Sequence, residues 1–484
     1  MIPKEMTPNI PEPILNLLHE IGEVGGEGTY LVGGFVRDLL LKRPSLDIDI
    51  VIEGDAIRVA NAICDRWNGT LEVHPQFGTA TVTPENVSLP KVDFVTARRE
   101  TYQDAGTLPI VQSGTITDDL HRRDFSINAL AMRLDTSAFG AIVDKTGGLE
   151  DLKSGIVRVL HKQSFIDDPT RIFRAARYAG RYGFRIAETD TILIQEALPV
   201  LARLSGERIR NEIDRLLLEK NASEIVEHLT QLDVWKTISE GWNISTTFAC
   251  DFKKAERAIA WASTHLTDEE FQPELVRWMA FLGTGTPIYQ IEALSLKLVL
   301  EHQLQRLISR AKAAKHQVSL EKVTHAAFAK LGIPLSENAF IEYQKGKWCI
   351  VDTDNTITYV CGDGHLYRVQ TPLTAYRELE QTLAPVKETA RPSEIYQLLK
   401  PYPTEALALG CVNTTLPKWK REKIKDYLFV LRKTEPFITG KDLITLGEKP
   451  SKNFETQLWK LFAAQLDGEI NKKEEAYSRL RTFV

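Results

Sequence analysis

LVGGFVRDLLLKRPSLDIDIVI, residues 31–52, is the stretch that decides the fold of the N-terminal part of the chain. Its first half is an apolar run that ends in Gly33-Gly34 and continues as an amphipathic segment, which predicts a strand, a tight turn and a helix. Its second half, DIDIVI (47–52), alternates charged and apolar residues with period two, as a half-buried strand does. Further strand-like segments follow at 71–84 and 91–100, so a mixed α/β domain is expected up to about residue 155.

Two acidic residues of the second strand are candidate metal ligands. Asp47 and Asp49 are two positions apart, which places both carboxylates on one face of a strand and leaves Ile48 and Ile50 for the buried face. Carboxylates this close repel each other, and a divalent cation between them relieves the repulsion. Phosphoryl transfer needs such an ion to neutralise triphosphate charge and to activate the attacking hydroxyl. The alternative interpretation is an edge strand with solvated aspartates.

The turn before this strand is a candidate phosphate site. A glycine such as Gly34 lets the backbone approach a phosphate, the following helix offers free N–H groups, and Arg37 adds a positive charge one turn in. A Gly-Gly pair is also common at structural turns. Its position about ten residues before the Asp47–Asp49 strand favours a phosphate cradle beside a metal site.

Composition narrows the class of protein without identifying it. The 484 residues are 43% apolar and 26% charged, as in a soluble globular protein of several domains. We expect a cytoplasmic protein with no membrane association, because the sequence has neither a long apolar run nor a secretory signal. Its five cysteines are scattered and argue against a disulfide framework or a thiolate zinc site. The net charge of −5 is not that of a protein that coats nucleic acid, but it leaves RNA open as a substrate.

Helical periodicity dominates after about residue 160, and one segment there carries regularly spaced charges. In DPTRIFRAAR (168–177), Asp168, Arg171, Arg174 and Arg177 are spaced by three, so on a helix Asp168 and Arg171 would be neighbours. Pro169 suits the first turn of such a helix. An adjacent carboxylate and guanidinium can recognise the Watson–Crick edge of a base, while Arg174 and Arg177 suit phosphate contact or support of the pair. A solvated basic helix face is the alternative.

Taken together, these motifs resemble those of a known enzyme family. LVGGFVRDLLL, DIDIVIEGD, RRDFSINALAM (122–132), DDPTRIFRAARYAGRYGF (167–184) and GERIRNEI (206–213) occur in order, as in the class II tRNA nucleotidyltransferases, which include CCA-adding enzymes and poly(A) polymerases. The resemblance covers about residues 28–235. It implies that Asp47 and Asp49 coordinate Mg²⁺ and that Gly34 and Arg37 contact the nucleotide. It also implies that Arg123 contacts the incoming nucleotide, that Asn128 positions its sugar, and that Asp168 and Arg171 serve as a protein template for CTP and ATP.

The resemblance also implies an architecture and a reaction. The fold class would be α+β: a nucleotidyltransferase head with a mixed sheet (1–155), then an all-α neck (156–235), body (236–372, with a small β patch at 348–370) and tail (373–484). The enzyme would add CCA, or part of it, to the 3′ end of tRNA without a nucleic-acid template. CC-only addition, A-only addition and poly(A) synthesis remain open, as do a non-catalytic RNA-binding protein of the same fold and the oligomeric state. One departure is Asp167, where the family usually has Glu.

Four other features carry weaker expectations. Asp93 is expected to be structural rather than a metal ligand, and residues 98–120 are expected to form a mobile loop. The helix at 206–217 is expected to buttress the base-recognition helix. A basic segment interleaved with aromatic residues is expected to contact tRNA, with an ordinary solvated helix as the alternative; it comprises Lys418, Trp419, Lys420, Arg421, Lys423, Lys425 and Tyr427.

Overall fold

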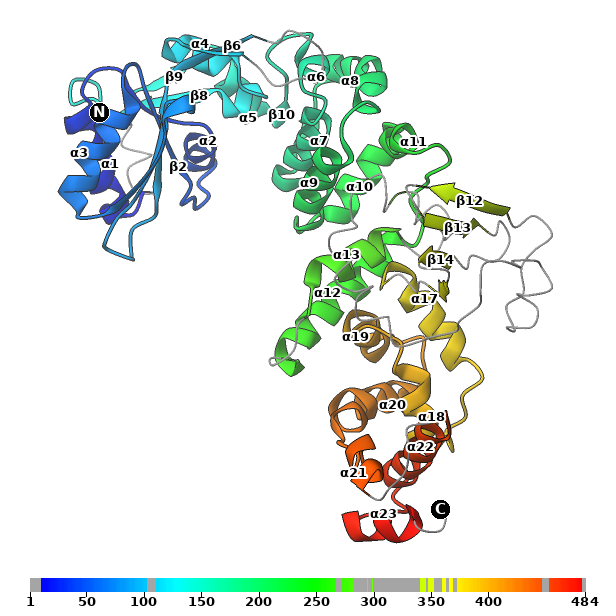
Figure 1. Ribbon diagram of the computed structural model, residues 1–484. Coiled ribbons are helices and arrows are strands. Elements are labelled where there is room, and N and C mark those ends of the chain that lie inside the picture. Colours follow the sequence, from blue (N-terminus) through cyan, green and yellow to red (C-terminus); the bar gives the residue numbers. More distant parts are fainter. Residues whose placement is uncertain are drawn as a thin grey trace. The chain divides into compact units, whose positions relative to one another are not determined.

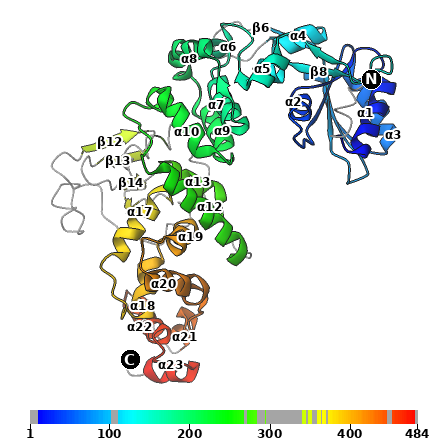
Figure 2. The ribbon, with the colours of Figure 1, turned by 180° about the vertical axis from the view of Figure 1, so that it is seen from behind.

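The computed structural model describes residues 10–101, 110–266, 271–282, 340–344, 347–351, 359–362, 365–368, 372–445 and 452–480, together with Leu294 and Leu298 (Figures 1 and 2). The chain folds as two compact units, Met1–Gly241 and Trp242–Val484. Within the described ranges, every helix is too short or too polar to cross a lipid bilayer.

The core of the first unit is a mixed sheet. In the described part of this unit, seven strands are hydrogen-bonded in the order β3-β4-β5-β2-β1-β8-β9. β2 and β5 are parallel, whereas the other neighbours in the sheet are antiparallel. The strands are β1 (Thr29–Val32), β2 (Ile48–Ile52), β3 (Thr70–His74), β4 (Thr79–Thr83), β5 (Val92–Thr96), β8 (Leu130–Arg133) and β9 (Ile142–Asp144).

The helices that flank this sheet begin where the sequence favours them. α1 (Glu12–Gly25) and α3 (Ala56–Trp67) lie on one face of the sheet, and α2 (Gly34–Leu40) lies on the other (Figure 1). Asp55 caps α3 by accepting a hydrogen bond from the Arg58 backbone N–H. The predicted strand, Gly turn and helix are confirmed as β1, Gly33 and α2, and the predicted alternating strand is confirmed as β2.

The segment expected to be a mobile loop has regular structure at both ends. β6 (Arg98–Thr101) pairs with β7 (Ile110–Ser113) as an antiparallel ribbon, and residues 102–109 between them lie outside the described residues. α4 (Ile116–His121) follows, and a capping box between Thr115 and Asp118 fixes its start. The expectation of a loop throughout 98–120 was therefore wrong for these strands and this helix.

The rest of the first unit is mainly helical, and the neck expected to be all-α also contains a two-stranded parallel sheet of β10 (Ile156–Val157) and β11 (Arg185–Ile186). α7 (Arg171–Tyr182) buries an apolar face against α9 (Gly206–Leu217) and α10 (Ala222–Gln231). α10 approaches α7 closely at Gly180, where a Cβ would lie 2.3 Å from the Ile225 side chain. Four further helices of the described residues belong to this unit: α5 (Gly148–Ser154), α6 (Ser164–Asp167), α8 (Glu188–Leu201) and α11 (Val234–Ile238). The predicted buttress is confirmed, because α9 packs directly on α7.

The second unit is also mainly helical, with one small sheet. The helices in its described residues are α12 (Phe248–His265), α13 (Pro273–Leu282), α17 (Pro372–Leu383), α18 (Pro392–Leu399), α19 (Thr404–Val412), α20 (Lys418–Phe429), α21 (Gly440–Thr445), α22 (Lys452–Leu466) and α23 (Lys473–Leu480). The predicted β patch is confirmed as an antiparallel sheet in the order β12-β13-β14-β15, and it begins earlier than expected. Its strands are Phe340–Gln344, Lys347–Val351, Tyr359–Gly362 and His365–Arg368. The α+β fold class is thus confirmed, and the division into four domains stays a prediction.

The basic segment of α20 is less available to RNA than the sequence suggests. Lys420 is buried, and its ammonium group donates to the carbonyl oxygens of Leu383 and Ala384 at the end of α17, over 2.6 and 3.0 Å. Lys423 likewise donates to the carbonyl of Ala390 over 2.9 Å. Cations at a helix C-terminus satisfy carbonyls that have no partner within the helix. These contacts engage the ammonium groups of Lys420 and Lys423 within the protein, and the tRNA contact expected of this segment stays a prediction.

Candidate active site

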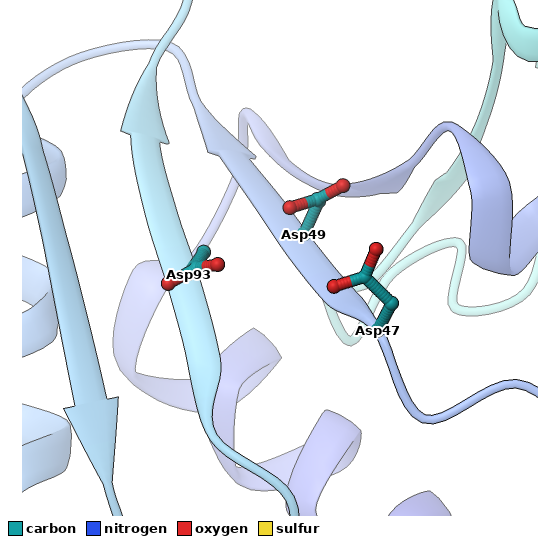
Figure 3. Close-up of side chains that lie close together, drawn as sticks. All are labelled: Asp47, Asp49 and Asp93. Atoms are coloured by element: carbon teal, nitrogen blue, oxygen red, sulfur yellow. The ribbon is translucent and has the colours of Figure 1, made fainter. Parts of the chain in front are cut away.

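Three carboxylates meet at one end of the sheet. Asp47 directly precedes β2, Asp49 lies in β2, and Asp93 lies opposite Asp49 in the parallel strand β5. One ligand oxygen from each lies within 4.8 Å of the others, and Figure 3 shows the three side chains on the same face. Ile48 and Ile50 are buried on the other face, as the alternation predicted. Asp93 was not expected to be a metal ligand, and the structure brings it into the cluster through the β2–β5 register.

The electrostatics of this cluster favour a bound cation. Burial and the neighbouring charge of Asp47 raise the pKa of Asp49 to about 6, although the positive charge of Arg123 opposes the shift. Asp93 is held by a hydrogen bond from the Thr81 hydroxyl on β4. Three converging carboxylates offer the hard oxygen ligands that Mg²⁺ prefers.

The glycine that approaches this cluster is Gly33. Its φ is +70°, and a Cβ there would lie 2.7 Å from Arg123 Nη1 and 3.9 Å from Asp49 Oδ2. A side chain would therefore occupy the space between the arginine and the carboxylate. Gly34, the predicted nucleotide contact, has more room. A Cβ added there would have Arg37 Nη2 as its nearest neighbour, at 3.5 Å. The positive φ and the close approach to Arg123 thus fall on Gly33, which the prediction for this turn did not select.

Arg123 is oriented by a buried carboxylate that the sequence analysis missed. Asp119, on α4, is fully buried and accepts from Arg123 Nη2 over 3.0 Å and from Arg122 Nη2 over 2.6 Å. Asp119 and Arg123 are four residues apart in the sequence. If a helix is expected to start after Thr115, this spacing predicts that the two side chains are neighbours, and it is the signal that could have revealed the pair. The pair keeps one guanidinium close to Asp49 without neutralising the cluster.

Arg37 is buried within the protein. Its side chain donates from Nε and Nη2 to the two carboxylate oxygens of Asp38, both over 2.9 Å, and from Nη1 to Asn128 Oδ1 over 2.5 Å. The residue is only 4% exposed. All three of its side-chain nitrogens therefore have protein partners, and its predicted contact with the nucleotide stays a prediction.

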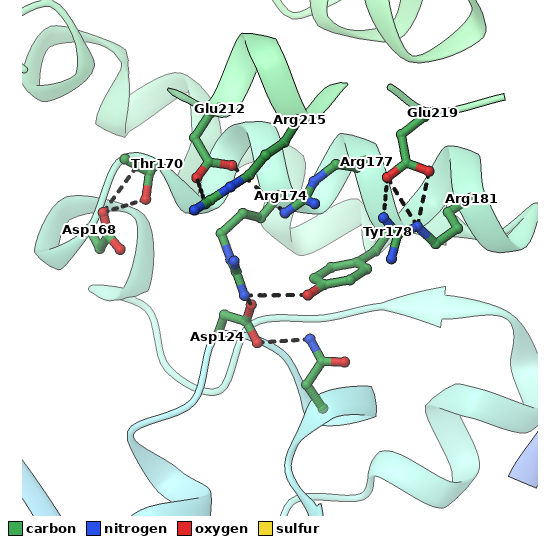
Figure 4. A network of polar contacts seen from close by, with 11 residues as sticks. Asp124, Asp168, Thr170, Arg174, Arg177, Tyr178, Arg181, Glu212, Arg215 and Glu219 are labelled. Atoms are coloured by element: carbon green, nitrogen blue, oxygen red, sulfur yellow. Dashed lines mark hydrogen bonds and ion pairs between the residues drawn. The ribbon is translucent and has the colours of Figure 1, made fainter. Parts of the chain in front are cut away.

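Asp124 lies at the centre of a polar network between the sheet and α7 (Figure 4). Its Oδ1 accepts from the Asn128 amide over 2.9 Å, and its Oδ2 accepts from Arg174 Nε over 2.8 Å. Burial alone would raise the pKa of Asp124, but the charge of Arg174 and these hydrogen bonds outweigh it and hold the pKa below its ordinary value. Arg174 is therefore committed to Asp124, and Asn128 links Asp124 to Arg37.

The predicted pairing of Asp168 with Arg171 is not present. Asp168 has extended backbone angles, φ −138° and ψ 93°, and α7 begins only at Arg171, so helical spacing does not apply between them. Asp168 Oδ1 instead accepts from Arg208 Nη2 of α9 over 2.9 Å and from the Thr170 hydroxyl over 2.7 Å. Arg171 is buried and donates to the Ser164 hydroxyl and to the backbone carbonyl of Arg122. Pro169 also lies before α7 rather than in its first turn.

Arg177 is buried as well, on the side of α7 that faces α9. Its Nη2 lies 3.8 Å from Glu212 Oε2, and Glu212 also accepts from Arg215 over 2.7 Å (Figure 4). This environment suits the predicted support of the recognition helix. The structure thus brings Asp47, Asp49, Gly33 and Arg123 together, and it places Arg174 and Arg177 in contacts between elements.

Comparison with known proteins identifies the family of this chain. Residues 29–158 match the poly A polymerase head domain, and residues 183–243 match the probable RNA and SrmB-binding site of polymerase A. An A-adding tRNA nucleotidyltransferase of Halalkalibacterium halodurans is 31% identical over 97% of this chain and 92% of its own length. A CC-adding tRNA nucleotidyltransferase of Geobacter sulfurreducens is 35% identical, over only 43% of this chain and 44% of its own length.

The solved structures extend the likeness to the whole chain. A CCA-adding enzyme in complex with ATP superposes with a TM-score of 0.69 at 28% identity, covering 99% of this chain and 98% of that one. The residues that match the poly A polymerase head domain include the carboxylate cluster and the Gly33 turn. The chain belongs to the family of tRNA nucleotidyltransferases.

Proposed function

We propose that this enzyme adds the terminal adenosine to tRNA that ends in CC. The observation that carries the proposal is the likeness to an A-adding enzyme at 31% identity over 97% of the chain. The CC-adding relative matches 43% of the chain. A likeness that spans both units supports a shared way of holding tRNA as well as a shared catalytic head.

Complete CCA addition is the second candidate. It is favoured by the likeness to the CCA-adding enzyme bound to ATP, which also covers 99% of the chain. Both candidates use the same chemistry, in which the 3′ hydroxyl of tRNA attacks the α-phosphate of a nucleoside triphosphate and pyrophosphate leaves. They differ only in whether CTP is accepted before ATP. We place the reaction in the cytoplasm, where these substrates are present.

The residues that would hold a divalent cation are Asp47, Asp49 and Asp93. Their oxygens converge within 4.8 Å, and burial together with the charge of Asp47 raises the pKa of Asp49, a cost of ionisation that a bound cation would offset. We propose Mg²⁺, because oxygen-only ligand sets suit it and because it binds triphosphates. When bound, the ion would neutralise triphosphate charge and make the 3′ hydroxyl more acidic.

The protein groups around the carboxylates would bind and orient the substrates. Arg123, held by Asp119, would contact the triphosphate beside Asp49. The hydrogen bonds that Asp168 accepts from described residues all fall on Oδ1, so Oδ2 is available to the exocyclic amino group of adenine or cytosine. Arg171 would complete recognition only by turning from Ser164 toward the base, a rearrangement that nucleotide binding would have to drive.

The test uses three tRNA transcripts that end at the discriminator base, in C and in CC, each incubated with Mg²⁺ and labelled CTP or ATP. We expect a single A on the CC-ended transcript and no addition of C to the other two. Full CCA on the first transcript would replace the proposal by the second candidate. Long A-tracts would indicate poly(A) synthesis. An Asp49→Asn variant serves as the negative control, and incorporation by that variant at the wild-type rate would refute the metal assignment.

A further inference from the structure

A threonine of β4 contacts the third carboxylate of the cluster. Thr81 lies opposite Asp93 in the antiparallel β4–β5 register, and its hydroxyl donates to Asp93 Oδ1 over 2.5 Å. Asp93 in turn lies opposite Asp49 in the parallel β2–β5 register, and Figure 3 shows these two aspartates on neighbouring strands. Because residues directly opposite each other share a face of a sheet, the three side chains form a row across β4, β5 and β2.

The orientation of Thr81 follows from the alternation of β4. Its neighbours Ala80 and Val82 are buried, at 1% and 0% exposure, on the face of the sheet that α3 covers. Thr79 and Thr83 lie on the same face as Thr81, so the preference of strands for threonine would explain all three residues equally. The hydrogen bond to the carboxylate is a contact of Thr81 that strand preference does not account for.

A hydrogen bond to one oxygen restricts how a carboxylate can turn. The terminal torsion of an aspartate is broad, and the negative charge of Asp49 would otherwise favour an Asp93 side chain that turns away from it. The hydroxyl of Thr81 stabilises the ionised form of Asp93, because a charge-assisted hydrogen bond is stronger than a neutral one. Thr81 is also a well-fixed donor, since its β-branched side chain has few rotamers. Asp93 can therefore stay directed at the cluster while it is ionised.

We propose that Thr81 is a positioning residue, which holds the Asp93 carboxylate in the orientation that a divalent cation requires. It acts through Asp93 and not by its own contact with the cation or the substrates. Removal of a hydrogen-bond partner from a metal ligand typically weakens metal binding by about 10–100-fold. The inference deepens the proposed function and rests on it, because that proposal assigns Asp93 to the metal site.

The position of this pair in the sheet indicates which substrate it serves. Gly33, beside Arg123, follows β1, whereas Asp93 is in β5, and β1 and β5 flank β2 on opposite sides. In an in-line displacement the attacking hydroxyl and the leaving pyrophosphate lie on opposite sides of the α-phosphate. A triphosphate bound beside Arg123 would thus leave the Asp93 side to the 3′ hydroxyl of tRNA. Loss of the Thr81 hydroxyl should therefore slow the attack without weakening the binding of the triphosphate group.

The experiment measures metal binding directly, in the full-length protein without tRNA or nucleotide. Wild type, Thr81→Val, Thr81→Ser and Asp93→Asn are titrated with Mn²⁺, and free Mn²⁺ is followed by electron paramagnetic resonance. Valine keeps the β-branched shape without the hydroxyl and should weaken Mn²⁺ binding by about tenfold, whereas serine keeps the hydroxyl and should remain within about twofold of wild type. Thr83→Val, at an exposed position on the same face of β4, is the matched control and should bind Mn²⁺ as wild type does.

Kinetics with CC-ended tRNA provide the second measurement. We expect kcat of Thr81→Val for ATP to fall about tenfold at limiting Mg²⁺ and to recover at high Mg²⁺. The KM for ATP and the inhibition constant of pyrophosphate should stay within about twofold of wild type. A purely structural role for Thr81 would instead lower kcat to the same extent at every Mg²⁺ concentration, together with Tm.

The outcomes separate this inference from the function on which it rests. If Thr81→Val binds Mn²⁺ like wild type while Asp93→Asn binds it weakly, the role of Thr81 alone is overturned. If Asp93→Asn binds Mn²⁺ like wild type, the metal assignment in the proposed function is refuted, and the role of Thr81 with it. Wild type that adds a nucleotide other than A would refute A-addition, and the Mn²⁺ titration would still decide the role of Thr81. Should Thr81→Val not fold, Thr81→Ala removes the hydroxyl without added bulk and is titrated in its place.

Discussion

Arg208 of α9 donates to Asp168 over 2.9 Å, so the carboxylate proposed to recognise the base is held by a neighbouring helix rather than by Arg171. Both side chains are partly exposed, at 34% and 27%. The ion pair is thus accessible to a nucleotide, and its value lies in orienting Asp168 more than in stabilising the fold. α9 therefore supports α7 and also orients the carboxylate that we propose recognises the base.

Replacing Arg208 should affect nucleotide selection with little effect on stability. We expect Arg208→Gln to lower kcat/KM for ATP by about fivefold to tenfold, because the Asp168 carboxylate loses a charged hydrogen bond that fixes its direction. Arg210→Gln, on the same helix and 3.8 Å from Asp214, is the matched control. Steady-state kinetics with ATP, together with thermal unfolding, provide the measurement. Equal losses in both variants would contradict a specific role for Arg208.

Neutralising Asp93 tests whether it completes the metal site. We expect Asp93→Asn to lower activity on the order of 100-fold at limiting Mg²⁺, with partial recovery at high Mg²⁺, because one of three ligand carboxylates is weakened. Asp65→Asn, at an exposed carboxylate of α3, is the control and should leave the Mg²⁺ dependence unchanged. If Asp93→Asn has the Mg²⁺ dependence of wild type, then Asp93 is not a ligand.

The raised pKa of Asp49 predicts how pH affects metal binding. With a pKa of about 6, Asp49 takes up a proton in the metal-free folded protein as the pH falls from 7 to 5, whereas an unfolded aspartate does not. The metal-free fold should therefore lose stability as pH rises through 6, and Mg²⁺ should restore it. We expect the Mg²⁺-induced rise in Tm to be full at pH 7 and to shrink below about pH 6. Asp49→Asn should show little rise at any pH, and a rise that stays constant in wild type down to pH 5 would contradict the assignment.

Local patterns in the sequence were sufficient to predict the elements that carry the first two carboxylates. Alternation from Asp47 to Ile52 and the Gly-Gly turn depend on neighbours along the chain, and the structure confirms both elements. Asp93 could not be assigned in this way, because its place depends on the parallel β2–β5 register, which a single sequence does not specify.

The helix around Asp168 shows why spacing alone can mislead. The spacing of three residues suggested an Asp168–Arg171 pair, but Asp168 precedes the helix and has extended backbone angles. The partners that replaced this pair, Arg208 and Ser164, lie on α9 and α6, and only tertiary packing brings them close. A boundary shift of two or three residues was enough to change the partner of each charged group.

Lys420 should prove important for stability rather than for tRNA binding. We expect Lys420→Met to destabilise the protein by about 2 kcal/mol, because two carbonyl oxygens at the end of α17 lose a charged donor. Lys418→Met, at an exposed position of the same helix, should change the free energy of unfolding by less than about 0.5 kcal/mol. Urea unfolding and tRNA binding by the folded variants provide the measurements. A loss of tRNA affinity in Lys420→Met without a loss of stability would instead support the expected tRNA contact.

A Cβ at Gly33 should harm catalysis far more than folding. Both Gly33 and Gly26 have a positive φ, +70° and +69°, so alanine at either position should cost about 1–2 kcal/mol in backbone strain. At Gly26 no atom lies within 4 Å of the added Cβ, whereas at Gly33 it would lie 2.7 Å from Arg123 Nη1. Gly33→Ala should therefore displace the guanidinium from the Asp49 carboxylate.

The matched pair separates strain from displacement. We expect Gly33→Ala to lower kcat/KM for ATP by about 100-fold and Gly26→Ala to remain within a few-fold of wild type, with similar decreases in Tm. If the two variants lose activity equally, backbone strain alone explains the effect and Arg123 has no special position. If Gly33→Ala is fully active, the turn is only a structural connection, and the triphosphate must be bound by cations other than Arg123.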